Sequence, residues 1–378
     1  MFRLFSFLLL LHTYIGWRLL PDMPSGSLAI PATILWLIAS TIVIPLGLFA
    51  RRMTPQPLSD RLAWAGLLAV GSFSSLFVLT LIRDIGLLAG SALSGVLVGP
   101  AALAALRSDG AIAVPILAAL STCVGFVNAR RRARVRRVDV PIANLPAPLH
   151  GFTIAQISDI HIGPTIKRDY VAAIVDAVND LGADMIAVTG DLVDGSVEQL
   201  SQHTEPLARL AARHGVFFVT GNHEYYSGAG PWVAEVRRLG LSVLMNEHVV
   251  LQHEGAAVVV AGVTDYGAHH FDPAHSSDPA AALAGAPSDA GVKLLLAHQP
   301  RSAFAAARVG FDLQLSGHTH GGQFFPWIFF VRLQQPFTAG LRRLGRLWVY
   351  ISRGTGYWGP PKRLGAPSEI THLRLVPA

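Results

Sequence analysis

The sequence GDLVDG at residues 190–195 follows an apolar run and decides the fold, because four similar clusters are spaced along the chain. SDIHIG lies upstream at 158–163, and GNHE at 221–224, AHQP at 297–300 and GHTHGGQ at 317–323 lie downstream. Each cluster ends a run rich in Val, Ile, Leu or Phe. Short apolar runs bounded by Gly and polar residues indicate buried β-strands, so the polar clusters are predicted to lie at strand ends.

The segments around these clusters alternate between two periodicities. Strands are predicted at 152–158, 184–190 and 215–221, separated by amphipathic helices at about 168–181 and 197–213. This pattern is typical of an α/β sheet covered on both faces, in which ligands bind at the carboxyl ends of the strands. Further strands are predicted at 256–263, 292–297, 312–316, 347–352 and 369–375.

The clusters supply the side chains that bind divalent metals. Each alone is weak, because a single His after an apolar run is more often a hydrogen-bonded structural residue, but the ordered set is not expected by chance. The single cysteine, Cys123, lies in an apolar stretch, so the set has no thiolate, which argues for an open hydrolytic site containing Mn, Fe or Zn. The candidate ligands are Asp159, His161, Asp191, Asn222, His223, His298, His318 and His320.

The first third of the chain has a different composition. Residues 1–129 carry eleven charged side chains, none of them Lys, and most of their apolar stretches are long enough to cross a bilayer as helices. We therefore predict a helical transmembrane domain with four spans. The stretch at 85–106 contains Gly86, Gly90, Gly95 and Gly99, and we expect it to be re-entrant or interfacial, although such spacing also suits a helix-packing face.

Arginines predict the orientation of these spans. Arg51, Arg52 and Arg61 follow the second apolar stretch, and RRRARVRR at 130–137 follows the last. With an even number of spans, both groups lie in the cytoplasm, in agreement with the positive-inside rule. Six arginines of this +6 chain lie in that one run, which favours contact with anionic membrane lipids over nucleic-acid binding.

The chain is thus expected to have three parts. These are a transmembrane domain at 1–129, a basic and Pro-rich linker at 130–149, and a soluble domain at 150–378.

The motifs DIH, GDLVD, GNHE, AHQ and GHTH together resemble the calcineurin-like metallophosphoesterase superfamily across roughly residues 150–376. The resemblance implies a four-layer α-β-β-α sandwich with two divalent metal ions. By position, it assigns one metal to Asp159, His161, Asp191 and His320, and the second to Asp191, Asn222, His298 and His318. Asp191 would bridge the two ions, and His223 would act on the substrate as the catalytic residue.

The implied reaction is hydrolysis of a phosphodiester or pyrophosphate bond by a water that the metals activate, with His223 giving a proton to the leaving group. The membrane helices and the segment SRGTGYWGPPKRLGAPSEI at 352–370 resemble the membrane-anchored bacterial branch of the superfamily. That likeness implies a multi-pass protein of the bacterial inner membrane with a cytoplasmic site. Its candidate lipid-linked substrate is UDP-2,3-diacylglucosamine. The alternative is a transporter or signalling protein whose metal domain is regulatory or degenerate.

Three further features leave alternatives open. Arg353, Tyr357 and Trp358, with Lys362 and Arg363 beyond them, either bind the substrate or form a surface loop. The loop at 264–291 is either a lid or a solvated loop. The apolar segment 324–330 docks on the bilayer, lines an acyl-chain groove or belongs to the core, and we expect the core.

Overall fold

The structure, a computed structural model, describes residues 2–93 and 98–378. These residues form two compact units. One unit contains residues 1–128 together with the short segment 359–364, and the other contains 129–358 and 365–378. The segment 359–364 therefore packs with a part of the chain that is more than two hundred residues away in sequence.

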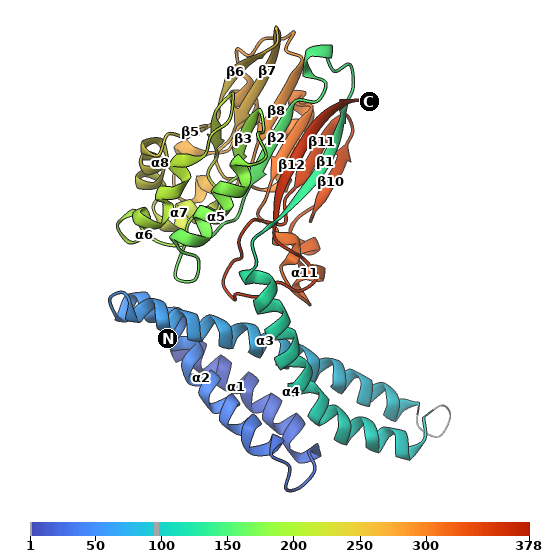
Figure 1. The fold of residues 1–378 in the computed structure, drawn as a ribbon. Coiled ribbons are helices and arrows are strands. Elements are labelled where there is room, and N and C mark those ends of the chain that lie inside the picture. Colours follow the sequence, from blue (N-terminus) through green and yellow to red (C-terminus); the bar gives the residue numbers. More distant parts are fainter. Residues whose placement is uncertain (1, 94–97) are drawn as a thin grey trace. The chain divides into compact units, whose positions relative to one another are not determined.

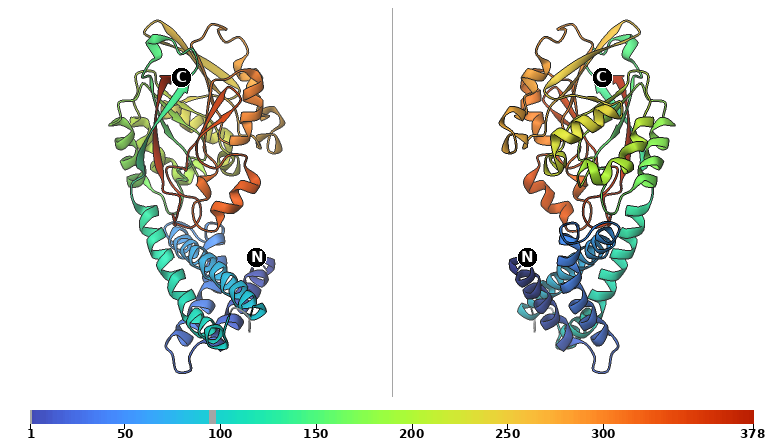
Figure 2. Two further views of the ribbon diagram at one scale, coloured as in Figure 1. Left: turned by 90° about the vertical axis from the view of Figure 1, so that its right-hand side faces the viewer. Right: turned by 90° about the vertical axis from the view of Figure 1, so that its left-hand side faces the viewer.

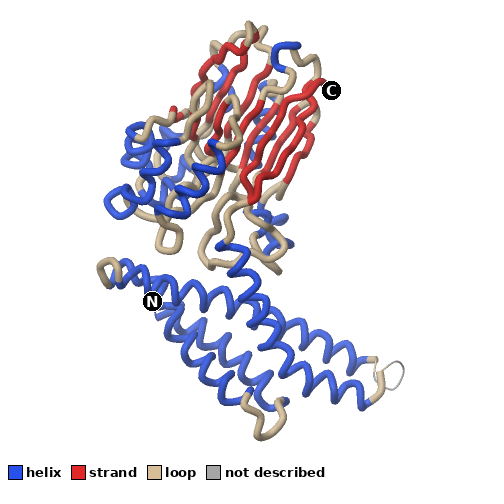
Figure 3. The backbone as a smooth tube through the Cα atoms, viewed as in Figure 1, coloured by secondary structure: helices blue, strands red, loops and turns tan. Residues whose placement is uncertain are grey.

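The first unit is helical. Within the described residues, four helices are long and apolar enough to cross a membrane. They appear as the long blue helices of Figure 3. The helices are α1 (Phe2–Leu19), α2 (Ala29–Met53), α3 (Leu58–Ala92) and α4 (Pro100–Arg130).

The stretch at 85–106 was predicted to be re-entrant or interfacial. Its described residues belong mainly to the ends of two long helices, because α3 continues to Ala92 and α4 begins at Pro100. Gly86 and Gly90 lie within α3, and Gly99 immediately precedes α4. Gly95 lies outside the described residues.

Two glycines set the packing of α2 against α3. A Cβ atom on Gly47 would lie 2.5 Å from the Gly66 Cα atom, and one on Gly66 would lie 2.6 Å from the Gly47 Cα atom. Larger residues would force the backbones apart, so this pair allows the close helix contact that small residues give in membrane proteins.

The helical unit also contains ionic side chains. Arg83 of α3 is buried and forms ion pairs with Asp22 and Asp84, and the Asp84 carboxylate accepts hydrogen bonds from Arg18 and Tyr14. The predicted apolar stretch at 62–82 ends just before Arg83 and Asp84, whereas α3 continues through both residues to Ala92. Pairing offsets the cost of burying these charges.

The segment 359–364 is held inside the helical unit by Lys362. Its Nζ atom donates hydrogen bonds to the Gly71 carbonyl (3.1 Å), to the Thr122 hydroxyl (3.1 Å) and to the Ser75 hydroxyl. The Arg363 amide donates to the Gly125 carbonyl at 2.8 Å. Both basic side chains are buried, so the interpretation in which they grip a phosphate is wrong for this structure.

Replacement of Gly125 by Ala tests this packing. The new Cβ atom would lie 2.5 Å from Lys362 Cγ, and contacts that short force a displacement. We expect Gly125→Ala to lower the Tm of the detergent-purified protein by several degrees. Ala is the better helix former, so Gly86→Ala, whose Cβ has only an ordinary 3.8 Å contact with Leu106, should leave the Tm unchanged or raise it. Equal Tm changes in the two variants would contradict the packing.

The second unit contains two six-stranded sheets, ordered β1-β12-β2-β3-β4-β5 and β10-β11-β9-β8-β7-β6. The predicted sandwich of two mixed sheets flanked by helices is confirmed. The green and orange helices cover opposite outer faces of the sheets in Figure 2. The strands of the first sheet are β1 (Arg134–Ile142), β2 (Thr153–Ile157), β3 (Met185–Val188), β4 (Val216–Phe218), β5 (Ser242–Val243) and β12 (Glu369–Pro377). Those of the second are β6 (Glu247–His253), β7 (Ala256–Gly262), β8 (Val292–Leu296), β9 (Leu313–Ser316), β10 (Gly340–Leu344) and β11 (Leu347–Ile351).

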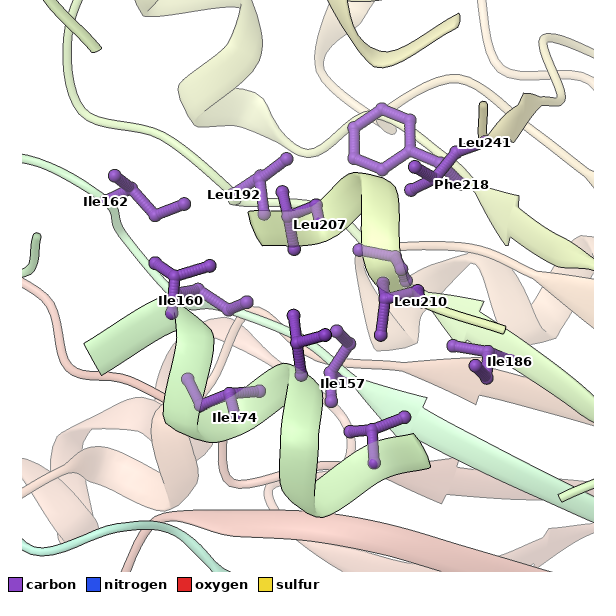
Figure 4. Packing of buried hydrophobic residues seen from close by; sticks show 14 of the residues in the cluster. Ile157, Ile160, Ile162, Ile174, Ile186, Leu192, Leu207, Leu210, Phe218 and Leu241 are labelled. Carbon is purple, nitrogen blue, oxygen red and sulfur yellow. The ribbon is translucent and has the colours of Figure 1, made fainter. Parts of the chain in front are cut away.

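Three apolar clusters hold these layers together. One lies between the sheets and includes Ile154, Met185 and Leu294. A second joins the first sheet to its helices, where Ile174 of α5 packs with Ile157 and Ile186 (Figure 4). A third lies on the outer face of the second sheet. Full burial of such a side chain contributes about 1.5–3 kcal/mol, so the clusters make the sheets a rigid scaffold. The helices of this unit are α5 (Arg168–Asn179), α6 (Val197–Thr204), α7 (Asn222–Ser227), α8 (Ala229–Arg238), α9 (Pro279–Leu283), α10 (Ala303–Val309) and α11 (Trp327–Gln334).

Part of the predicted linker at 130–149 is a strand instead. β1 begins at Arg134, only three residues after α4 ends, and pairs in parallel with β12 through a register that sets Arg134 beside Glu369. Its arginine-rich sequence hides the strand pattern, because β1 is an edge strand whose first residues are exposed. The chain therefore enters this unit at the end of the first sheet where β12 begins.

Candidate metal centre

The predicted polar clusters gather at this same end of the sheets. β2, β3 and β4 run parallel to one another, and so do β7, β8 and β9, so the carboxyl ends within each set lie together. The two sets meet, since the His318 amide after β9 donates a hydrogen bond to Asp159 Oδ1 after β2 at 2.8 Å. All eight sequence-predicted residues with metal or catalytic roles are therefore close together.

Five of these residues have an unusual backbone conformation. Their φ angles are positive, in the left-handed region that costs a non-glycine residue on the order of 1–3 kcal/mol. Such strain persists only where the surrounding structure enforces it, and it is concentrated at functional sites. The five residues are Asp159 (53°), His161 (56°), Asp191 (52°), His318 (70°) and His320 (51°).

Asp159, His161 and His320 form the first group of donor atoms. The Nε2 atoms of His161 and His320 are 3.0 Å apart, and His320 Nε2 is 3.6 Å from Asp159 Oδ1. One potential ligand atom from each residue lies within 4.8 Å of the others. That spacing allows the three to share one metal ion.

Asp191, His298 and His318 form the second group. His298 Nε2 is 3.1 Å from Asp191 Oδ2 and 3.2 Å from His318 Nδ1. The Asn222 side-chain oxygen is also 3.0 Å from His318 Nδ1, so this neutral oxygen joins the group. Burial and the nearby His298 lower the pKa of His318 to about 3, so its ring is neutral and has a lone pair available for a metal.

The Asp191 carboxylate lies between the two groups. Its Oδ2 atom is 3.1 Å from His298 Nε2 in the second group and 3.8 Å from His161 Nε2 in the first. A single carboxylate in this position can contact two ions, as the family resemblance implies for Asp191.

Hydrogen bonds behind the donor atoms fix the orientation of two histidines. His298 Nδ1 is 2.8 Å from the Thr189 carbonyl, and His161 Nδ1 is 3.0 Å from Asp194 Oδ1. A ring nitrogen that donates to oxygen leaves the opposite nitrogen, Nε2, with a lone pair directed into the site.

The loop that holds Asp191 is built around Glu224. This buried carboxylate accepts hydrogen bonds from the backbone amides of Asp191, Leu192 and Gly221, at 3.0, 2.7 and 2.6 Å. Burial and the nearby Asp191 charge raise the pKa of Glu224 to about 7. Gly221 is required beside it, because a Cβ atom there would lie 2.2 Å from Asp191 Oδ1.

His223 lies at the exposed side of the site. Its Nδ1 atom is 2.6 Å from Asp194 Oδ1, so one carboxylate links His223 to His161. Burial lowers the pKa of His223, but the hydrogen bond to Asp194 and the charge of Asp191 outweigh this effect and raise it to about 9. Because His161, Asp194 and His223 also have donor atoms within 4.8 Å of one another, the geometry alone permits a metal there as well.

Aromatic side chains border His223. The Tyr226 and Trp358 rings contact it edge-on, with centroid distances of 5.1 and 5.7 Å, and both rings are more than half exposed. Phe271 from the loop at 264–291 packs against Tyr226 at 5.5 Å. The Gln323 side chain fixes the Trp358 backbone through two hydrogen bonds, which ties Trp358 to the loop of His318 and His320.

The other two predicted substrate contacts have different surroundings. Tyr357 is buried in the core, and its hydroxyl contacts Arg130 and the Thr165 carbonyl, so in this structure it is a packing residue and its predicted substrate contact is wrong. Arg353 forms an ion pair with Glu369 at 2.9 Å and packs beside Gly321 of the histidine loop. Of the three, only Trp358 is exposed beside His223.

Three supporting residues were missed by the sequence analysis. Asp194 and Glu224 lie inside the quoted motifs GDLVDG and GNHE, where carboxylates close to candidate ligands could have signalled them. Gln323 ends GHTHGGQ, but its partner is 35 residues further along the chain, and no local pattern predicts that contact.

The donor set fits divalent metals. The Asp159 Oδ2 atom is buried and has no hydrogen-bond partner within the described residues, so this oxygen is available to a cation. Imidazoles, carboxylates and one amide oxygen also form the mixed ligand set that Mn, Fe and Zn accept.

The chain belongs to the calcineurin-like phosphoesterase family. Residues 152–322 match that family. An uncharacterized metallophosphoesterase of Aquifex aeolicus is 33% identical over 244 residues, which are 64% of this chain and 91% of that protein.

Two other relatives are longer. A "Transmembrane protein with metallophosphoesterase domain" of Danio rerio is 38% identical over 70% of this chain, and an uncharacterized metallophosphoesterase of Helicobacter pylori is 37% identical over 67%. The matches span 62% and 66% of those proteins. The four apolar helices and the name of the Danio rerio relative support a membrane protein. Since a vertebrate protein is among the relatives, the expected bacterial branch is not confirmed.

Replacing Gly221 by Ala tests the close approach to Asp191. The Cβ atom would displace the carboxylate, so we expect the purified Gly221→Ala protein to lose most of its bound divalent metal in elemental analysis. Gly230→Ala is the control, because nothing lies within 4 Å of the Cβ atom it would add. Full metal content in Gly221→Ala would show that the Asp191 position is unimportant for metal binding.

Proposed function

We propose that this protein is a membrane-anchored phosphoesterase that uses two divalent ions, Mn, Fe or Zn, to hydrolyse a phosphodiester or pyrophosphate bond. One observation carries the proposal. Donor atoms of two residue groups converge on either side of Asp191, and His223 lies beside them without belonging to either group.

The two groups give each residue a role. Asp159, His161, Asp191 and His320 would hold one ion, and Asp191, Asn222, His298 and His318 would hold the other. When bound, such ions acidify water and neutralise negative charge on phosphoryl oxygens. The backbone strain at five of these residues fixes their donor atoms before any ligand arrives.

His223 is proposed as the general acid. Asp194 occupies its Nδ1 atom and favours the protonated ring, so Nε2 is the atom that can give a proton to the leaving oxygen. As the bond from phosphorus to the leaving group breaks, this proton converts the departing alkoxide or phosphate into a neutral alcohol or a less charged phosphate.

Two substitutions separate the proposed roles. His223→Asn removes only the proton donor, so we expect kcat to fall about 10²–10⁴-fold while the metal content is retained. Asp191→Ala removes the shared ligand and should abolish both activity and most metal binding. Elemental analysis and turnover are measured on the same samples. A loss of metal in His223→Asn would make His223 a ligand and would contradict its role as acid.

We further propose a lipid-linked substrate, for which UDP-2,3-diacylglucosamine is the candidate. Two features support this class. The chain carries its own membrane helices, and exposed aromatic rings of Tyr226 and Trp358 border the proposed acid, where an apolar or planar part of a substrate can pack.

The reaction class is tested with the full chain in lipid nanodiscs loaded with Mn²⁺. The substrates are UDP-2,3-diacylglucosamine, bis(p-nitrophenyl) phosphate and p-nitrophenyl phosphate. We expect turnover of the first two and weaker turnover of the monoester. If a metal-loaded protein hydrolyses none of the three, the proposed function is contradicted. If it hydrolyses the diester but not UDP-2,3-diacylglucosamine, only the proposal of this lipid-linked substrate is contradicted.

Trp358 is expected to affect substrate binding more than chemistry. Its ring contacts His223 but supplies neither a proton nor a ligand atom, so Trp358→Ala should raise KM several-fold with a smaller change in kcat. Trp358→Phe keeps an aromatic ring and should restore most of the affinity. Steady-state kinetics on the diester measure both constants, and an unchanged KM in Trp358→Ala would exclude the contact.

We propose that the catalytic unit faces the cytoplasm, which in a bacterium is the inner face of the inner membrane. α2 ends and α3 begins near Arg52 and Arg61, and α4 ends in the arginine run at 130–137. With four spans these segments share one side of the membrane, and loops rich in arginine remain in the cytoplasm.

A further inference from the structure

The helix α11 has an apolar surface that the rest of the described chain does not cover. This helix contains eight residues, and none of them is buried. Trp327, Phe329 and Phe330 are each more than half exposed, and Leu333 is 82% exposed. Segment 324–330 was expected to belong to the core. Phe324 is buried, as expected, but the exposure of Trp327, Phe329 and Phe330 contradicts that expectation. A cluster of large exposed apolar side chains indicates an interaction site.

These side chains share one face of the helix. At about 100° per residue, Phe329, Leu333, Phe330 and Trp327 fall on one arc, which also includes the exposed Gln334, and Arg332 lies beside it. Ile328 and Val331, which are less exposed, occupy the opposite side. Both sides of the helix are therefore apolar, and the side with Trp327, Phe329, Phe330 and Leu333 is exposed.

The exposed face is rigidly held. At the start of α11, a Cβ atom on Gly322 would lie 2.3 Å from Ile328 Cα, so the helix packs directly on the histidine loop. At its end, Arg301 donates a hydrogen bond to the Gln334 carbonyl, and the buried Gln335 side chain donates one to Gln299. These contacts hold both ends of α11 in place with its apolar face exposed.

We propose that α11 inserts its apolar face into the interfacial layer of the lipid bilayer. The bilayer is the occupant that this chain supplies itself, since its first unit contains four candidate membrane helices. Only residues 131–133 separate α4 from β1. The first residues of β1 lie at the end of the sheets that carries the histidine loops. α11 lies at that end of the sheets as well (Figure 1).

Charge and composition also favour a lipid surface. No Asp or Glu occurs between Asp312 and Glu369, so α11 lies in a stretch free of acidic residues that anionic headgroups would repel. Trp, Phe and Leu are the side chains that interfacial membrane segments bury, and Arg332 beside them is a cation that can contact anionic headgroups. A water-soluble partner would also cover the face, but it would have to be recruited, whereas the membrane is always present.

The proposal has a consequence for the neighbouring loop. α11 begins seven residues after His320 and packs against Gly322, so its insertion would hold the loop of His318 and His320 at the lipid surface. A substrate embedded in the membrane could then reach the site without leaving the bilayer. The insertion itself does not depend on the catalytic proposal.

Site-specific fluorescence tests the insertion. Cys123 is the only cysteine in the sequence, so a Cys123→Ser background allows single labels at Phe329→Cys and Leu333→Cys. The control label is Arg346→Cys. Arg346 is exposed in the turn between β10 and β11, at the opposite end of the strands from the histidine loop. The full-length protein is labelled with the polarity-sensitive dye NBD and placed in phosphatidylcholine–phosphatidylglycerol nanodiscs, with or without doxyl-labelled lipid chains.

The expected result is blue-shifted emission at both α11 positions and at least about twofold quenching by doxyl lipids, with neither effect at residue 346. Water-like emission at both α11 positions would overturn the proposal. Blue-shifted emission without lipid quenching would also overturn it, because protein, such as a second copy of the chain, would then cover the helix. Retained metal content and Tm in each labelled variant show that the fold is intact.

Discussion

The Asp191 carboxylate lies between two sets of imidazoles, and the surrounding loops are arranged to hold it there. Its side chain is nearly inaccessible to water, and a buried charge is costly unless partners compensate it. Glu224 fixes the Asp191 backbone, Gly221 leaves space for the Asp191 oxygen, and His298 contacts that carboxylate from the second sheet. The two sheets must therefore pack in one relative position for the site to exist. The apolar core between the sheets fixes that position, which links the stability of the sandwich to the geometry of the site.

Much of this arrangement could be predicted from sequence, because strand ends and metal-binding side chains leave local signals. The alternation of apolar runs and polar clusters predicted a sheet covered on both faces, and the family resemblance implied the sandwich. The motifs identified the candidate ligands around Asp191, but not the supporting residues Asp194 and Glu224. Features that depend on distant partners were not predictable. Tyr357 is buried because Arg130 and Thr165 lie over its hydroxyl, and β1 is a strand only because β12 pairs with it. Lys362 is another example, since its hydrogen-bonding partners lie in α3 and α4, far from it in sequence.

The helical unit contains the segment 359–364 in addition to the four long helices. Its glycines at 71 and 125 accommodate the segment 359–364, and Trp358, which borders His223, immediately precedes that segment in the chain. Gln323 then connects Trp358 to the histidine loop, from which α11 follows directly. The Trp358 backbone is therefore held by the loop that carries His318 and His320.

The central claim is that Asp191 joins two metal ions in one centre. Electron paramagnetic resonance of the full-length protein loaded with Mn²⁺ tests it most directly, because ions about 3.5–4 Å apart that share a carboxylate are magnetically coupled. The account predicts a multiline spectrum of an exchange-coupled Mn pair at two ions per chain. A spectrum of isolated Mn²⁺ at the same metal content would mean that the two groups of residues act as separate sites, and it would contradict the bridging role of Asp191.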